Sequence, residues 1–134
     1  MSSLTISTNP KQLDHVFIHR YLSEQSYWAK GMRATTLRKA LANSLCFGGF
    51  LDGQQIAFAR VVTDFATFAY LRDVFVDTPY QRRGYGKTLM QAILQHPELA
   101  GVTLLLHTND AHDFYEKFGF FKPAMPERQM LRRL

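Results

Sequence analysis

Residues 71–87, LRDVFVDTPYQRRGYGK, are the most informative stretch of the sequence, because they lead an apolar strand through a turn with two glycines into a helix. Gly84 and Gly86 have no Cβ, so the backbone there can approach a ligand closely. The N-terminus of the following helix exposes unpaired N–H groups and carries partial positive charge, which favours a phosphate. Basic side chains in the same stretch add charge and hydrogen-bond donors: Arg82, Arg83 and Lys87. The stretch therefore predicts a phosphate-binding loop.

Two common nucleotide motifs do not fit this loop. Gly86-Lys87-Thr88 matches the end of a Walker motif, but Gln81 stands where its first glycine is required. A dinucleotide fingerprint needs a third glycine at position 89, which is Leu. A glycine-rich turn with exposed arginines stays open as the plain alternative.

Upstream of the loop, the pattern predicts two helices followed by three antiparallel strands. Residues 4–7 alternate as an edge strand does, and Asn9-Pro10 is typical of a helix start. The first helix is expected to reach about Glu24, and Thr35 is expected to cap the second. The strands are predicted at 46–51, 55–63 and 68–76, with Asp52-Gly53 as the first hairpin turn.

Downstream of the loop, a helix with periodic apolar residues ends before Pro97, and a strand is predicted at 102–107. Asp110 is expected to begin a further helix that Gly119 closes. From Phe120 onward we expect one or two terminal strands containing Met130. The sequence therefore predicts an α+β (mixed α/β) fold, a mostly antiparallel sheet with one central β-α-β crossover and flanking helices.

Composition limits the class of protein. The 134 residues, 46% apolar and 20% charged, predict one globular domain, 1–134. The net charge of +5 suits a phosphorylated partner, but no interleaved basic and aromatic stripe favours nucleic acid. No apolar run could span a bilayer, and the first residues do not resemble a signal peptide. A lone cysteine, Cys46, fits a cytoplasmic protein, and we expect no membrane partner.

Two segments carry a resemblance to a known family. Residues 81–86, QRRGYG, resemble the Q/R-x-x-G-x-G/A signature of the GCN5-related N-acetyltransferase (GNAT) superfamily. Residues 108–120, TNDAHDFYEKFGF, resemble its second signature, an Ala-x-x-x-Tyr helix that ends in Gly-Phe. The two occur in the family's order, separated by a helix and a strand, and the resemblance covers residues 45–122 best.

The resemblance implies acetyl coenzyme A as the cofactor. Its pantetheine arm would bond the backbone of Phe75 and Val76, and its pyrophosphate would lie on the loop formed by Gln81, Arg82, Arg83, Gly84, Tyr85, Gly86 and Lys87. Asn109 matches a polar position that contacts the pantetheine arm in the family. The strand at 102–108 should splay from the strand at 68–76 and leave a gap for the thioester. Tyr115 matches the family's general acid.

Each candidate also has a plainer interpretation. Tyr115 lies at helical spacing with Phe114 and Phe118, as a core tyrosine does. Asn109 could cap the helix that follows it. The general base is open between Asp73, Glu24 and Asp110. Asp73 is the first choice because it lies on the strand that lines the gap, with a solvated carboxylate as the alternative.

The predicted function is transfer of an acetyl group from acetyl coenzyme A to an amine by direct attack. The acceptor is a small-molecule or protein amine, and Trp28, Tyr27 and Phe17 are candidates to wall its pocket, with core packing as the alternative. A non-catalytic acyl-coenzyme A sensor on the same fold is the alternative function. We expect no metal, since His15 and His19 lack further ligands. A homodimer is left open.

Overall fold

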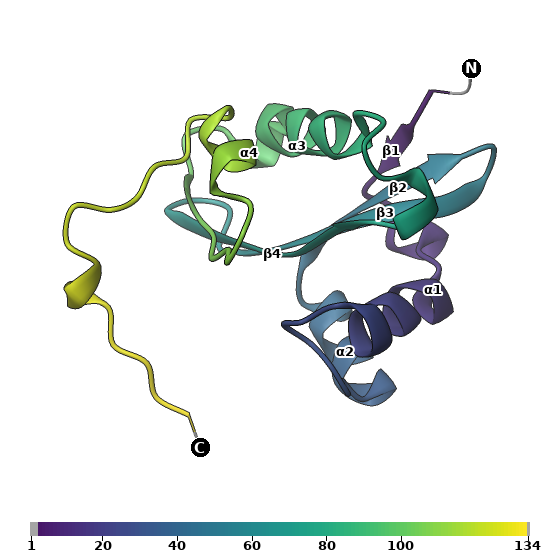
Figure 1. Ribbon diagram of the computed structural model, residues 1–134, viewed down its shortest axis with the longest axis horizontal. Coiled ribbons are helices and arrows are strands. Elements are labelled where there is room, and N and C mark those ends of the chain that lie inside the picture. The colour runs from purple at the N-terminus through teal and green to yellow at the C-terminus, as the bar shows by residue number, and fades with distance from the viewer. Residues whose placement is uncertain (1–2, 134) are drawn as a thin grey trace.

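The computed structural model describes residues 3–133, which form an open five-stranded sheet with helices on both faces (Figure 1). The ends of the predicted domain, residues 1, 2 and 134, lie outside the described residues. The strands follow one another in chain order: β1 (Thr5–Ser7), β2 (Leu45–Leu51), β3 (Gln54–Thr63), β4 (Phe68–Val76) and β5 (Thr103–Leu105). The first four pair antiparallel, and β5 is parallel to β4. The predicted mostly antiparallel sheet with one β-α-β crossover is confirmed.

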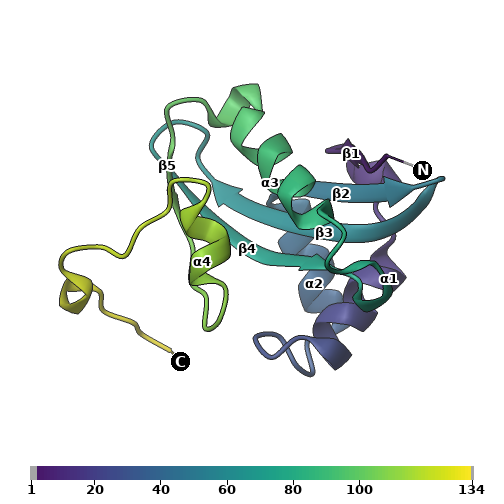
Figure 2. The same ribbon diagram turned by 45° about the horizontal axis from the view of Figure 1, so that its top comes forward.

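The helices form two layers. Helices α1 (His15–Arg20) and α2 (Ala34–Ala42) cover one face, and α3 (Tyr85–Gln95) and α4 (His112–Glu116) lie against the other (Figures 1 and 2). A π-helical turn at Tyr21–Gln25 continues α1, so the predicted first helix changes its winding instead of running on evenly. Short 3₁₀ turns complete the helical segments: Pro10–Gln12, Thr78–Tyr80, Pro97–Leu99 and Pro126–Arg128.

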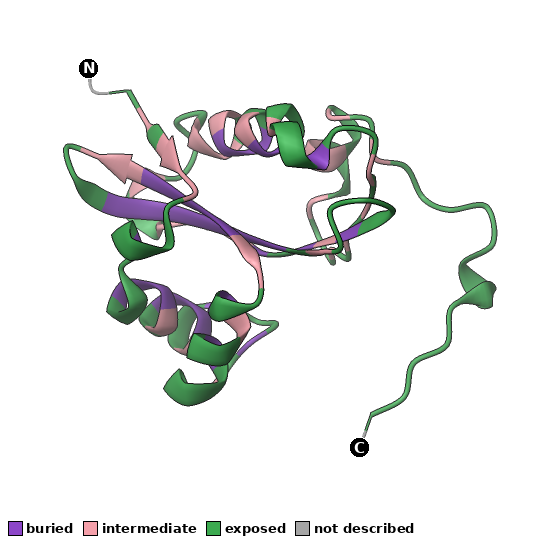
Figure 3. Cartoon of the chain, turned by 180° about the vertical axis from the view of Figure 1, so that it is seen from behind, coloured by how far each residue is buried: buried purple, intermediate pink, exposed green. Residues whose placement is uncertain are grey.

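The sheet separates two hydrophobic cores. Phe58 and Phe75 belong to the core under α1 and α2, whereas Val61 and Leu71 belong to the core under α3. Side chains alternate between the two faces along a strand, and an irregularity in β4 between Leu71 and Phe75 places these two residues on opposite faces. Figure 3 shows the buried residues along the middle of the strands and on the inner sides of the helices. The only cysteine, Cys46, is buried in the first core, and this burial raises the pKa of its thiol to about 11.

The exposed turn between β3 and β4 is held by one carboxylate. Asp64 accepts a hydrogen bond from the Thr67 hydroxyl and further bonds from the backbone N–H groups of Thr67, Ala66 and Phe68. These donors, the Thr67 hydroxyl first, hold the pKa of Asp64 well below its usual range. The hairpin predicted from this short polar segment is confirmed.

The predicted terminal strands are wrong. Residues 121–133 contain no strand, and every residue among them is exposed (Figure 3). Residues such as Phe121 and Met130 have the apolar character of a strand, but the segment pairs with neither edge strand of the sheet, β1 or β5, and apolar character without pairing does not make a strand. Residues 121–133 run away from the sheet (Figure 1). None of the helices in residues 3–133 has the length and apolar character needed to cross a membrane.

Candidate active site

A gap opens where β4 leaves β5. The two strands pair only at Phe68–Tyr70 with Thr103–Leu105. Beyond this point the register between β3 and β4 shifts. Phe58 pairs with Phe75 and Arg60 pairs with Arg72, so β4 advances by three residues where β3 advances by two. One extra residue therefore lies in β4, and Asp73 there adopts a positive φ of 54°. Such a bulge bends a strand, and the predicted splay of the two strands is confirmed.

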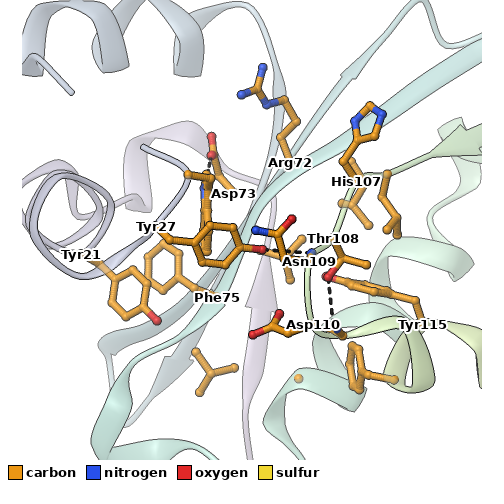
Figure 4. Close-up of a pocket in the computed structure, with 18 of the residues that line it drawn as sticks. Tyr21, Tyr27, Arg72, Asp73, Phe75, His107, Thr108, Asn109, Asp110 and Tyr115 are labelled. Carbon is orange, nitrogen blue, oxygen red and sulfur yellow. Dashed lines mark hydrogen bonds between the residues drawn. The ribbon is translucent and has the colours of Figure 1, made fainter. Parts of the chain in front are cut away.

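The gap encloses about 1040 Å³. Its walls are β4 from Tyr70 to Val76, the chain that follows β5 at 106–111, and side chains from the π-helical turn and α4 (Figure 4). On the side away from β3, residues 71–76 have no neighbouring strand. Alternate backbone N–H and C=O groups of this half of β4 are therefore available to a ligand.

The predicted phosphate loop lies at one end of the gap. A second hollow of about 270 Å³ is lined by six of its residues: Gln81, Arg82, Gly84, Tyr85, Gly86 and Lys87. Gly84 precedes α3 with a φ of 84°, and no side chain caps the helix there. A Cβ on Gly86 would lie 3.5 Å from the Phe114 ring and would project between the two hollows. The open N-terminus and the missing Cβ together leave room for an anion.

The remaining residues of the loop and the strand end have different positions. Gln81 lines both hollows, and its side-chain amide donates to the Val76 carbonyl at 2.8 Å, which ties the loop to β4. Arg83 lies 5.9 Å from the Tyr80 ring and lines neither hollow. Phe75 is buried, and Tyr21 stacks on it with ring centroids 3.9 Å apart. At Phe75, the backbone is therefore the part that can meet a ligand.

Tyr115 reaches from α4 towards the segment after β5 and lines the gap (Figure 4). Its ring packs on Phe114 and Phe120, so it also belongs to the second core. Burial, followed by the neighbouring Tyr27 hydroxyl and Asp110 carboxylate, raises the pKa of Tyr115 to about 12. The phenol therefore keeps its proton at neutral pH and can act as a donor.

Asn109 does not cap α4. The backbone N–H of Ala111 donates to the Thr108 hydroxyl at 3.0 Å, and α4 itself begins at His112. The Asn109 N–H donates to the Tyr27 hydroxyl at 3.3 Å, as Figure 4 shows. Asn109 lines the gap as an exposed residue. The capping interpretation is therefore wrong, and the role towards a ligand stays a prediction.

Asp73 is a buried carboxylate with both oxygens occupied. Its Oδ2 accepts from the Arg60 Nε at 2.8 Å, and its Oδ1 accepts from the Trp28 Nε1 at 2.8 Å. The residue is only 5% exposed, which excludes the solvated carboxylate of the sequence interpretation. The Arg60 guanidinium also donates to the Ser44 hydroxyl at 3.2 Å. Asp73 thus fixes Trp28 in the wall of the gap, whether or not it also accepts a proton.

Several residues of the gap were missed by the sequence interpretation. Tyr21 and Tyr70 line it, and the Tyr70 hydroxyl lies 2.6 Å from the Nδ1 of His107, a histidine that was considered from the sequence but matches no family motif. The alternation of β4 could have suggested Tyr70, since it shares a strand face with Arg72. Phe17, considered for an acceptor pocket, is instead a buried core residue 5.6 Å from the Phe75 ring.

Within the described residues, no group of three or more His, Cys, Asp or Glu side chains could hold a metal ion. His15 and His19 share helix α1, but the His19 Nε2 lies 2.7 Å from the Met32 carbonyl oxygen. This ring nitrogen is hydrogen-bonded to the backbone and is therefore not available to a metal ion shared with His15.

Comparison with known proteins agrees with this geometry. A sequence profile of the acetyltransferase (GNAT) family matches residues 15–120. A protein of Gibberella zeae assigned as an acetyltransferase is 31% identical, over 85% of this chain and 77% of its own. A crystal structure from Xanthomonas campestris, of a protein assigned to the GNAT acetyltransferases, is 47% identical. It covers 100% of this chain and 95% of its own, with a TM-score of 0.96.

The fold also recurs at low sequence identity. An aminoglycoside N-acetyltransferase solved in complex with coenzyme A is 19% identical, with 100% of this chain and 96% of that chain covered and a TM-score of 0.70. At this identity the likeness concerns the fold alone.

Proposed function

Because this chain belongs to the acetyltransferase (GNAT) family, we propose that it transfers an acetyl group from acetyl coenzyme A to an amine nitrogen of an acceptor. The observation that carries the proposal is the gap between β4 and residues 106–111, which joins the glycine loop at one end to Tyr115 on its wall. A phosphate-binding end, a strand with unpaired backbone groups and a proton donor thus share one continuous space.

The residues present fit coenzyme A. The uncapped N-terminus of α3 and the missing Cβ atoms of Gly84 and Gly86 suit its pyrophosphate, and Arg82 and Lys87 add positive charge at the same hollow. The unpaired half of β4, at Phe75 and Val76, suits the amides of the pantetheine arm. Arg83 lies outside both hollows, so we assign it the long-range attraction of a basic residue only.

The chemistry needs one proton moved. Acetyl coenzyme A supplies a thioester, so that transfer to a neutral amine forms a C–N bond, breaks a C–S bond and moves a proton from nitrogen to sulfur. Tyr115 holds a proton at its hydroxyl and lines the gap from α4, which suits donation to the leaving sulfur. Backbone N–H groups near Phe75 and Val76 could donate to negative charge that develops on an oxygen in the gap.

The proton acceptor is the least determined role. Asp73 is our first choice by position, yet both its oxygens already accept hydrogen bonds. Asp110 is exposed, lines the same gap and lies near the Tyr115 hydroxyl. The variants Asp73→Asn and Asp110→Asn separate the two, because loss of the base lowers turnover most at low pH, where the amine is most protonated. A structural role for Asp73 would instead lower the melting temperature without changing the shape of the pH profile.

The decisive experiment compares two glycines. Gly84 and Gly53 both have positive φ, 84° and 83°, and open space around a would-be Cβ, but only Gly84 lies at the proposed phosphate site. Gly84→Glu should remove acetyl coenzyme A binding in calorimetry, because the new side chain is negatively charged and fills the anion's place. Gly53→Glu carries a similar backbone strain and should bind as the parent does. Equal binding by both variants would place the phosphate elsewhere.

Turnover then separates an enzyme from a sensor. An acceptor panel of amino acids, polyamines, aminoglycosides and peptides with free amines, followed by release of free coenzyme A thiol, should show product with at least one amine. Binding of acetyl coenzyme A without amine-dependent thiol release across the panel would favour the non-catalytic acyl-coenzyme A sensor.

A further inference from the structure

One cation on the wall of the gap has no carboxylate partner among the described residues. The charged side chains that line the gap are Arg72, Asp73, Arg82 and Asp110. Asp73 is paired with Arg60, and Arg82 also lines the second hollow, at the phosphate loop. Arg72 is exposed and forms no ion pair within residues 3–133. Its positive charge is therefore not neutralised by the fold.

Ring contacts hold Arg72 in position. Its Cζ lies 5.3 Å from the centre of the Tyr70 ring, a cation–π contact. The Tyr70 hydroxyl lies 2.6 Å from the His107 Nδ1, and the two rings meet edge-on with centroids 5.4 Å apart. All three residues line the gap. A guanidinium that lies over a ring keeps N–H donors in its own plane, so it can bind a planar anion.

Arg72 lies away from the phosphate loop. It is four positions before Val76 on β4, a span of about 13 Å in a strand, and Val76 is the residue of β4 that lines the second hollow. In Figure 4, Arg72 and His107 lie at the top of the view, above Asp110 and Tyr115. Arg72 thus belongs to a part of the gap that the phosphates of a cofactor would not fill.

Partly exposed aromatic rings line the gap as well. Tyr27 is 53% exposed and Trp28 is 38% exposed, and their rings meet edge-on with centroids 5.1 Å apart. Trp28 is fixed by its hydrogen bond to Asp73, the residue that follows Arg72. Apolar walls with a few placed polar groups are typical of a site for a small molecule.

We propose that Arg72 selects the acceptor by binding a carboxylate, so that the preferred acceptors are small amines that also carry a carboxylate, as amino acids do. This inference rests on the proposed function and narrows its acceptor. A guanidinium can donate two parallel hydrogen bonds to one carboxylate, which fixes the orientation of the acceptor as well as its position.

The charges of the gap favour the same class of acceptor. Asp110, which also lines the gap, has no ion pair in the described chain and attracts the ammonium form of an incoming amine. The wall therefore offers opposite charges to the two ends of a zwitterion. A polyamine or an aminoglycoside, which has several positive charges, would instead meet the like charge of Arg72.

The test uses pairs of amines that differ only in the carboxylate. One series pairs α-amino acids with their decarboxylated amines, such as phenylalanine with phenylethylamine. A second pairs ω-amino acids with alkylamines, such as 4-aminobutanoate with propylamine, because the carboxylate then lies further from the amine. Release of coenzyme A thiol gives kcat and KM for each compound.

At least one carboxylate compound should exceed its partner in kcat/KM by about tenfold or more. Arg72→Gln should raise the KM of that compound by about 10- to 100-fold, the effect of a hydrogen bond to a charged group, and should largely keep kcat. The KM of the partner amine should stay the same. Arg72→Lys keeps the charge but loses the planar fork, so it should recover only part of the preference.

Arg20→Gln is the matched control. Arg20 is exposed, lies 5.7 Å from the centre of the Phe17 ring and has no ion pair in residues 3–133, but it does not line the gap. This variant should treat both members of each pair as the parent does. Unchanged affinity for acetyl coenzyme A would show that every variant is folded.

A binding measurement separates failure of this inference from failure of the proposed function. The protein is saturated with coenzyme A, which has no acetyl group to transfer, and is titrated with both members of each pair by calorimetry. Carboxylate-dependent binding that Arg72→Gln abolishes, without any turnover, would support Arg72 as a ligand residue and overturn only the acetyl transfer.

The opposite result is equally distinct. Turnover without a carboxylate preference in any pair, or a preference that survives Arg72→Gln, would overturn the role of Arg72 and leave acetyl transfer standing. The absence of a carboxylate preference in both turnover and binding would overturn it too.

Discussion

Along β4, residues 68–70 have a strand on each side, whereas residues 71–76 have β3 on one side and the gap on the other. The two halves belong to one continuous strand and differ by one inserted residue near Asp73. In the first half, every backbone group can find a partner within the sheet. In the second half, part of them must bond to water or a ligand. The bulge thus lies in the half of β4 whose outer backbone groups are not paired with another strand.

The two halves are also held in place differently. The paired half is fixed by its ladder and by apolar packing of Ala69 against the second core. The unpaired half is fixed by polar contacts across the first core, in which Asp73 accepts from Arg60 and Trp28. A buried ion pair is costly to break, because the remaining charge has no solvent. This pair therefore restrains the strand where the sheet itself no longer does.

The largest effect should come from Tyr115→Phe, which removes the proposed proton donor on the wall of the gap beside the unpaired half. Turnover should fall by roughly 10²–10⁴-fold, the usual contribution of a positioned acid, while acetyl coenzyme A affinity changes little. Steady-state thiol release and calorimetry measure the two quantities.

Tyr70→Phe is the comparison from the paired half, since it removes only the hydroxyl bonded to His107. It should cost up to about tenfold in turnover, the effect of one hydrogen bond. Full activity of Tyr115→Phe with chemistry rate-limiting would make Tyr115 the core residue that its packing on Phe114 and Phe120 also suggests.

A smaller effect, on stability, should follow from Arg60→Met. The substitution leaves the Asp73 carboxylate buried without its cation, which should lower the free energy of unfolding by about 3–5 kcal/mol. Arg72→Met is the matched control, because Arg72 pairs with Arg60 across the ladder but is exposed and has no ion pair in the described chain. It should change stability by about 0.5 kcal/mol or less. Urea unfolding measures both changes in the free energy of unfolding. Equal losses for the two variants would mean that the ion pair does not restrain the bulge.

The smallest effect concerns alkaline pH. Burial first, then Tyr27 and Asp110, raises the pKa of Tyr115 to about 12 from 10.0. The folded state thus keeps a proton that the unfolded state loses, so this contribution is complete below pH 10 and is lost as pH rises to about 12. Between pH 9 and pH 11, Tyr115→Phe should lose about 1 kcal/mol less stability than the parent. Parallel losses in urea titrations would show that the hydroxyl is solvated.

The sequence predicted the central strands well because their signals are local. Asp52-Gly53 and the turn at Asp64 fix the hairpins, and β2, β3 and β4 fall within one residue of their predicted limits. The glycine loop was recognisable for the same reason. The sequence did not reveal the hydrogen-bond partners of Asp73, one of which is Trp28, 45 residues away. These contacts depend on the bulge in β4 and on the direction that the π-helical turn gives to the chain.

The terminal segment failed for a different physical reason. Its apolar residues satisfy the composition of a strand, but pairing depends on a free edge or surface in the right place, which no property of Phe121 or Met130 reveals. The plain interpretation of Asn109 as a cap failed because a neighbour one residue earlier, Thr108, accepts the N–H instead. The notion of Tyr115 as either core or site residue also proved too narrow, since it packs in the second core and lines the gap.

The buried Cys46 has a practical consequence. Its thiol is 4% exposed and its pKa is raised to about 11, so in the native protein it should be almost inert to aromatic disulfide reagents. Free coenzyme A can therefore be followed by thiol reagents with little background from the protein. Because Cys46 is the only thiol in the chain, the rate at which it is labelled also measures how often β2 and the first core open. The same reagent can thus time both turnover and unfolding in one cuvette.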